Sequence, residues 1–154
     1  MSVELDIASL ANALQEAAAV EILPRFRNLG DGDVRVKTEA IDLVTEADEA
    51  AERLIRARVA EFMPDALFVG EEAVAADASL LDKLAGADLA VVVDRIDGTF
   101  NFASGLPLFG VMLSVVSKGE TVAGLIFDPM GNDWVIAEKG SGAWMCSADG
   151  SQTQ

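Results

Sequence analysis

The stretch Leu89-Ala90-Val91-Val92-Val93-Asp94-Arg95-Ile96-Asp97-Gly98-Thr99 decides how the rest of the chain is interpreted. Its first five residues form a continuous apolar run with β-branched residues at the end, which is typical of a strand in the interior of a sheet. This strand is expected to deliver Asp94 at its carboxyl end. A carboxylate there costs free energy unless it is paired or bound to a metal ion, so Asp94 is a candidate functional residue.

Two helices are expected before this strand. Apolar residues recur at spacings of three and four from Val3 to Arg27, and again from Thr45 until Pro64 ends the second helix. Short strands are expected at residues 34–37 and 66–69. The alanine-rich, acidic segment that follows the second of these strands favours a loop and a short helix.

The last third of the chain has a different pattern. Four short apolar or alternating segments, separated by turn-forming residues, lie at 109–117, 121–127, 134–138 and 143–145. This pattern is typical of an antiparallel meander. The sequence therefore predicts an α+β fold, with two N-terminal helices packed on one face of a largely antiparallel sheet. Residues 1–146 are expected to form this domain, and residues 147–154 a polar tail or the start of a linker.

The composition excludes several kinds of protein. The 154 residues include 26 acids, 11 bases and no histidine, for a net charge of −15. This charge argues against binding to nucleic acid or to an anionic membrane. The absence of histidine excludes Ser-His-Asp and Cys-His catalysis. The single Cys146, with no signal peptide and no apolar run of about 20 residues, predicts a cytoplasmic location.

The remaining chemistry must use carboxylates, lysine, hydroxyls, backbone groups and a hard metal ion. Asp94 and Asp97 lie three residues apart around a tight turn and can point into one space. Gly98 lets the backbone turn sharply, and Thr99 offers a hydroxyl at the start of a helical turn that suits phosphate. With Glu71, the two aspartates make a set of three acids that suits Mg²⁺ and two-metal hydrolysis.

Each of these residues also has an ordinary structural interpretation. Asp48 fits the capping-box position of the second helix. Glu71 and Glu72 fit a solvated turn. The Asp97-Gly98 dipeptide fits an ordinary turn, and Lys37 fits a surface lysine. The order and spacing of the segments together, rather than any single residue, favour a functional site.

Together, the segments 42–48, 70–72 and 94–102 resemble the inositol monophosphatase family. These are Mg²⁺-dependent, lithium-sensitive phosphatases of inositols and sugars that share a fold with fructose-1,6-bisphosphatase. The family signature Asp-Pro-hydrophobic-Asp-Gly-Thr-x-Asn-Phe is met at 94–102 except at its second position. The resemblance covers essentially the whole chain. It implies the N-terminal half of the layered sugar-phosphatase fold, with the C-terminal domain of the family absent from this chain.

The resemblance also implies a reaction and the residues that perform it. The reaction is hydrolysis of a phosphate monoester such as inositol monophosphate by metal-activated water, without a phospho-enzyme, and full activity needs the C-terminal domain. The implied ligands of two or three Mg²⁺ ions are Glu71, Asp94, the Ile96 carbonyl and Asp97. The implied catalytic residues are Asp48, Thr99 and Glu71. The phosphate is implied to bind to Gly98, Thr99 and Asp97. The supporting residues are Lys37, which balances charge, Asp42 and Glu72.

Other properties follow from the same resemblance. A homodimer and inhibition by Li⁺ are expected, with a small phosphorylated polyol or sugar as substrate and with neither nucleic acid nor membrane as partner. Two alternatives stay open. The chain could belong to a phosphatase for another small phosphate, such as 3′-phosphoadenosine phosphate, fructose bisphosphate or histidinol phosphate. It could also be a catalytically silent metal-binding or interaction domain.

Arg95 stands where the family signature has proline. Proline would hold Asp94 in an extended conformation and fix its own φ angle, and arginine removes both restraints. We expect Arg95 to weaken metal binding, either by pairing with a carboxylate or by loosening the loop. An outward-facing arginine with an unchanged loop is the alternative.

Overall fold

The computed structural model describes residues 4–28, 34–36 and 43–154 of the chain. The helices in these ranges are α1 (Ile7–Ala17), η1 (Ala18–Ile22), η2 (Leu23–Arg25), α2 (Glu46–Phe62), α3 (Glu71–Ala76), α4 (Leu80–Gly86) and α5 (Thr99–Ala103). None of the described helices is long and apolar enough to cross a membrane. The strands are β1 (Val34–Val36), β2 (Leu43–Thr45), β3 (Leu67–Val69), β4 (Ala90–Asp97), β5 (Gly110–Ser117), β6 (Glu120–Asp128), β7 (Asp133–Glu138), β8 (Gly142–Ser147) and β9 (Gln152–Thr153).

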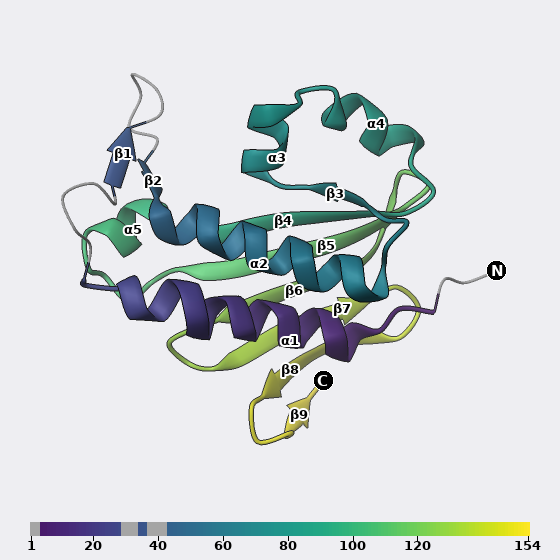
Figure 1. The fold of residues 1–154 in the computed structure, drawn as a ribbon. Helices are drawn as coiled ribbons and strands as arrows, with labels where there is room; N and C mark the ends of the chain where they lie inside the picture. The colour runs from purple at the N-terminus through teal and green to yellow at the C-terminus, as the bar shows by residue number, and fades with distance from the viewer. Residues whose placement is uncertain (1–3, 29–33, 37–42) are drawn as a thin grey trace.

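The main layer is a seven-stranded sheet in the order β3-β4-β5-β6-β7-β8-β9. Strand β3 is parallel to β4, and every later pair is antiparallel. Helices α1 and α2 lie side by side across one face of this sheet (Figure 1). The predicted α+β architecture, with its two helices and its meander, is therefore confirmed. Residues 147–154, expected as a polar tail, include β9, which pairs with β8.

The core lies between the two helices and the sheet. Leu10 and Leu14 of α1 and Ile55 of α2 are fully buried, as the helical spacing of apolar residues requires. Leu113 and Leu125, which are paired across β5 and β6, are buried as well. Packing of these side chains holds the helices in place above the strands.

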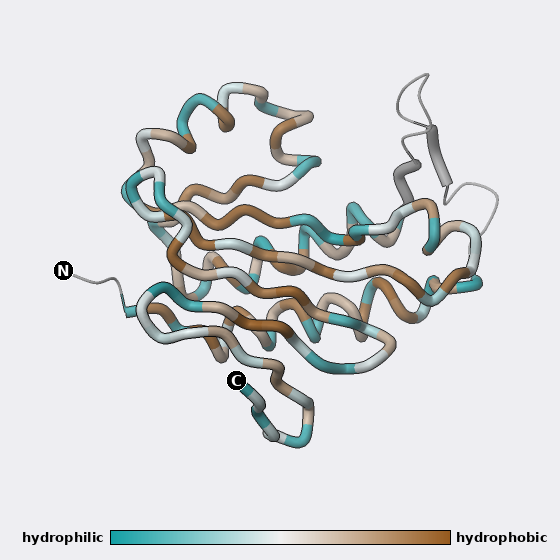
Figure 2. Tube along the Cα trace, turned by 180° about the vertical axis from the view of Figure 1, so that it is seen from behind, coloured by the Kyte–Doolittle hydropathy of each residue, from teal (hydrophilic) through white to brown (hydrophobic). Residues whose placement is uncertain are grey.

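The other face of the sheet lacks a covering layer within the described residues (Figure 2). Register places Met112, Ile126, Val135 and Met145 opposite one another on four successive strands, so they share one face. Ile126, Val135 and Met145 are each about half exposed. The molecule therefore presents an apolar row on the side away from α1 and α2.

The first helix is shorter than its periodicity predicts. The expected helix runs to Arg27, but the α-helix ends at Ala17 and continues as a π-helical turn and a short 3₁₀ turn. Pro24 lies in the 3₁₀ turn. Because proline has no N–H and its ring clashes with the carbonyl four residues earlier, a regular α-helix is kinked or broken at this position.

Strand β4 is longer than expected and carries a bulge. Asp94 was predicted to end the strand, but it pairs with Met112 and the strand continues to Asp97. The register shifts between these two aspartates. As a result Asp94 and Asp97 are both exposed, while Arg95 and Ile96 between them are both buried. Regular alternation would have placed the two acids on opposite faces.

Asp6 caps α1 and gives the fold a pH-dependent contribution. Its carboxylate accepts hydrogen bonds from the Ser9 amide at 3.0 Å and the Ser9 hydroxyl at 2.7 Å. These bonds lower the pKa of Asp6. The ionised form therefore stabilises the fold. This contribution is complete above the unfolded-state pKa of about 3.9 and is lost as the pH falls through the lower folded-state pKa.

We predict that Asp6→Ala lowers the melting temperature at pH 7 and that the difference from wild type shrinks as the pH is lowered to 3. Thermal unfolding across this range measures it. Asp65→Ala, which removes an exposed carboxylate from a turn, is the control. A difference that stays constant between pH 7 and pH 3 would contradict the capping role.

Candidate functional site

The turn after β4 has a backbone that only glycine fits well. Gly98 has a φ of 93°, in the left-handed region, and a Cβ there would lie 2.8 Å from the Leu108 carbonyl oxygen. Thr99 begins α5, and its hydroxyl donates to the Ile96 carbonyl at 2.9 Å. This hydrogen bond closes the turn that carries Asp97.

Three predicted carboxylates influence one another beside this turn. Although Asp94 as a residue is exposed, partial burial of its carboxyl raises its pKa, and the charge of Asp97 raises it further. The Arg95 cation lowers the pKa of Asp94, and the charge of Glu71 raises it. Because like charges held together favour a compensating cation, this region suits a positively charged ligand.

The side chain of Arg95 is the centre of the site and is 1% exposed. Its Nη1 donates to Glu52 Oε2 at 2.7 Å. Its Nη2 lies 3.4 Å from Glu71 Oε2 and 3.6 Å from Glu72 Oε1, and its Nε lies 3.6 Å from Asp48 Oδ1. The expected pairing with a carboxylate is found, and the alternative of an outward-facing arginine is wrong. The physical reason is that these acids together offset the cost of burying the guanidinium.

Sequence reasoning missed Glu52, which organises the site from α2. Its buried carboxylate accepts the amides of Glu72 at 3.0 Å and Ala73 at 2.9 Å, in addition to Arg95. It therefore caps the start of α3 from a neighbouring helix. A signal existed, because Glu52 follows Asp48 by four residues and so lies on the same face of α2.

Gly70 precedes α3 and makes room for this contact. A Cβ at Gly70 would lie 2.5 Å from the Glu52 Cδ and Oε1 atoms. Its φ of −134° is ordinary, so close approach rather than backbone conformation requires glycine here. The Gly-Glu-Glu segment is thus shaped by a carboxylate from α2.

The predicted residues fall into two overlapping groups. Asp48, in the first turn of α2, lies with Glu71 and Glu72 around Arg95. Glu71 also acts on Asp94, which links this group to the turn after β4. The location of Asp48 agrees with a helix start, but its buried carboxylate also faces a cation. Lys37 and Asp42 lie outside the described residues.

The oxygen donors of the predicted site are of the type that binds Mg²⁺, but in the described residues they do not converge on one metal position. Carboxylates and the Ile96 carbonyl are the oxygen ligands that Mg²⁺ prefers. Among the described residues, however, no three acidic or cysteine side chains lie close enough to hold a metal ion as they stand. One cause is visible: the Glu71 carboxylate lies against Arg95. The residue types therefore suit Mg²⁺, while the Glu71 carboxylate contacts Arg95.

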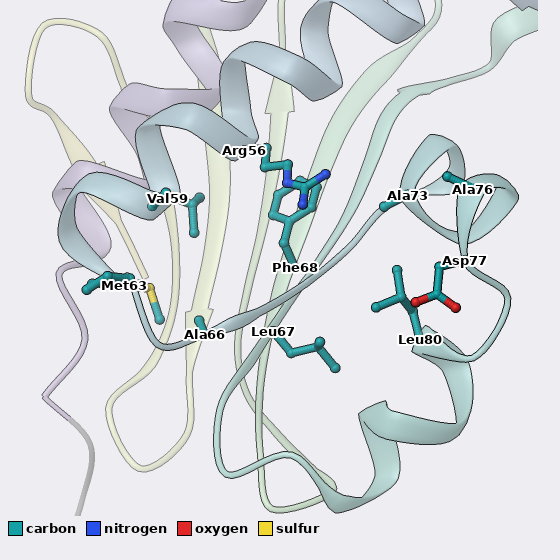
Figure 3. Close-up of a pocket in the computed structure, with 12 residues that line it drawn as sticks. Arg56, Val59, Met63, Ala66, Leu67, Phe68, Ala73, Ala76, Asp77 and Leu80 are labelled. Carbon is teal, nitrogen blue, oxygen red and sulfur yellow. The ribbon is translucent and has the colours of Figure 1, made fainter.

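A separate pocket of about 460 Å³ lies between the end of α2, β3 and the α3–α4 segment (Figure 3). Arg56 stands over the Phe68 ring in this pocket, with its Cζ atom 5.8 Å from the ring centroid. The opposite wall includes Asp77 and Leu80. None of the predicted site residues is among those that line it, so the pocket and the carboxylate site are distinct.

The glycine at position 70 gives a direct test of the Glu52 contact. We predict that Gly70→Ala lowers the free energy of unfolding by about 1–3 kcal/mol, because the added methyl displaces the Glu52 carboxylate from Arg95 and from α3. Gly86→Ala is the matched control, since a Cβ at Gly86 meets nothing within 4 Å. It should leave stability unchanged or raise it by up to about 1 kcal/mol. Urea unfolding measures both, and equal effects would contradict the contact.

Comparison with known proteins points to one family. Residues 5–154 match the inositol monophosphatase family. The chain is 38% identical over 112 residues to the fructose-1,6-bisphosphatase/inositol-1-monophosphatase of Thermotoga maritima, covering 73% of this chain and 40% of that protein. It is 35% identical over 106 residues to the inositol-1-monophosphatase of Rhizobium meliloti, covering 68% of this chain and 37% of that protein.

The fold also resembles a solved structure over nearly its whole length. The extragenic suppressor protein suhB from Bartonella henselae superposes with a TM-score of 0.77 at 29% identity, covering 90% of this chain and 51% of that one. The chain spans less than half the length of the two curated relatives. On its sequence match and its fold, the chain belongs to the inositol monophosphatase family.

Proposed function

We propose that this chain carries the carboxylate half of an active site that hydrolyses a phosphate monoester, such as inositol monophosphate, with Mg²⁺. The observation that supports this most directly is the group formed by Glu71, Asp94 and Asp97. Asp97 and Glu71 both raise the pKa of Asp94, so the three carboxylates act on one region. Such a group attracts the divalent ion on which the proposed reaction depends.

Glu71, Asp94, the Ile96 carbonyl and Asp97 would hold the ion. When bound, Mg²⁺ would neutralise phosphate charge and increase the acidity of water. Two or three ions are proposed from the family resemblance, and Li⁺ is proposed as an inhibitor on the same ground. Burial and the charges of Asp97 and Glu71 raise the pKa of Asp94, even with Arg95 beside it, so a bound cation would stabilise the ionised Asp94 carboxylate.

The chain's own residues would position the substrate and the attacking water. The amides of Gly98 and Thr99 would hold the phosphate, next to Asp97. The Thr99 hydroxyl uses its proton on the Ile96 carbonyl, so its oxygen is left to accept a hydrogen bond from water. Asp48 is held beside Arg95 and, with Thr99 and Glu71, would orient that water. Glu72 supports the site from α3, and Lys37 and Asp42 keep the supporting roles that the resemblance implies.

The substrate is proposed at the level of a small phosphorylated polyol or sugar. Fructose bisphosphate is the second candidate, because the Thermotoga maritima relative is a fructose-1,6-bisphosphatase/inositol-1-monophosphatase. Other small phosphates and a catalytically silent metal-binding domain are the alternatives. We also propose a homodimer and a cytoplasmic location, with the net charge of −15 disfavouring nucleic acid and anionic membranes as partners.

Phosphate release tests the proposal. We predict slow, Mg²⁺-dependent release of phosphate from inositol monophosphate by this chain, because it carries only the carboxylate half of the proposed site. Fructose bisphosphate and 3′-phosphoadenosine phosphate are assayed in parallel. Asp97→Asn should reduce the rate by about 100-fold or more, because it removes a proposed ligand of the ion. Asp88→Asn, at an exposed position before β4, is the matched control and should keep the wild-type rate.

The alternatives predict other outcomes. Mg²⁺ binding without release from any of the three substrates would replace the phosphatase proposal for this chain with the silent metal-binding domain. Release that is equal in wild type and Asp97→Asn would contradict the proposed role of the carboxylate group.

A further inference from the structure

The buried guanidinium of Arg95 contacts four carboxylates. Asp48 and Glu52 approach Arg95 from α2, and Glu71 and Glu72 approach it from the start of α3. The Arg95 Nε atom is buried and has no hydrogen-bond acceptor within the described part of the chain. The site therefore contains a fixed positive charge among acids that the proposed function assigns to a divalent ion and its surroundings.

The contacts of this guanidinium differ in strength. The Nη1 contact with Glu52 is a 2.7 Å hydrogen bond between side chains that are 1% and 4% exposed. The Nη2 contact with Glu71 is 3.4 Å long, and the Glu71 side chain is 51% exposed. Because the contact is long and the Glu71 carboxylate can be solvated where it stands, Glu71 can leave Arg95 while Arg95 stays bonded to Glu52.

We propose that Arg95 is a resident cation of this acidic site. The Arg95 guanidinium holds Glu71 when no divalent ion is bound, and it competes with that ion for the Glu71 carboxylate. The proposal rests on the proposed function, because the ion is the one proposed there. It explains why the described acids do not converge on a metal position, and it predicts that Arg95 lowers the affinity for Mg²⁺.

The backbone at position 95 allows a sharp test. Arg95 lies in the irregular stretch between Asp94 and Asp97, where the β4–β5 register shifts. Proline is tolerated at such bulges, so Arg95→Pro restores the residue of the family signature without interrupting the regular ladder. Arg53→Gln is the matched control, because it removes one positive charge from an exposed position on α2, next to Glu52 in the chain.

Isothermal titration with Mg²⁺ measures the effect directly. Arg95→Pro should bind Mg²⁺ about tenfold more tightly than wild type, whereas Arg53→Gln should stay within about twofold. Equal affinities of wild type and Arg95→Pro, with both binding, would overturn the resident-cation proposal alone. Absence of Mg²⁺ binding in both proteins would overturn the proposed function together with it.

A second measurement covers the case in which Arg95→Pro fails to fold. The side-chain Nε–H resonance of Arg95, assigned by its loss in Arg95→Lys, can be followed by NMR during a Mg²⁺ titration of the wild-type chain. It should move and saturate with the ion, because Glu71 leaves the guanidinium. The Nε–H of Arg58, which pairs with Glu16, should stay fixed. An Arg95 resonance that is unmoved while Mg²⁺ binds would overturn the proposal.

Discussion

The buried ion pair between Arg95 and Glu52 is the constraint on which the candidate site depends. Transfer of two charges out of water costs several kcal/mol for each ion unless good geometry and further hydrogen bonds offset it. Both conditions hold, because the Glu52 carboxylate is 2.7 Å from Arg95 and also accepts the amides of Glu72 and Ala73. This contact therefore ties α2, α3 and β4 together at the place where the acids gather.

Strand β4 links this constraint to function. It pairs with β3 on one side and β5 on the other, so its position in the sheet is fixed. Arg95 is buried on the same alternation as Val91 and Val93, and the bulge that follows buries Ile96 as well and brings Asp97 to the surface. Strand alternation therefore accounts for the exposed Asp94 and the buried Arg95, and the bulge accounts for the exposed Asp97. This chain differs from the family signature at the second position and still forms the turn at Gly98, with a positive charge placed among its acids.

Long periodic patterns predicted most of the fold. The helical stripe of α2 and the alternating strands after Phe109 were found because each pattern is repeated over many residues. The bulge in β4 was missed because it depends on pairing with β5. Pairing of Arg95 with a carboxylate was expected, but Glu52 was missed as its partner because the two residues are 43 positions apart, and no local pattern reports a contact at that separation. Spacing identified the acids, but tertiary packing decided which of them faces a cation.

A double-mutant cycle on Glu52 and Arg95 tests the central claim most directly. The free energies of unfolding of wild type, Glu52→Gln, Arg95→Gln and the double variant are measured in urea. If the pair organises the site, each single variant loses about 3–5 kcal/mol, and the double variant loses at least about 2 kcal/mol less than the sum of the two. Losses that add to within about 0.5 kcal/mol would show two independent side chains and contradict the account.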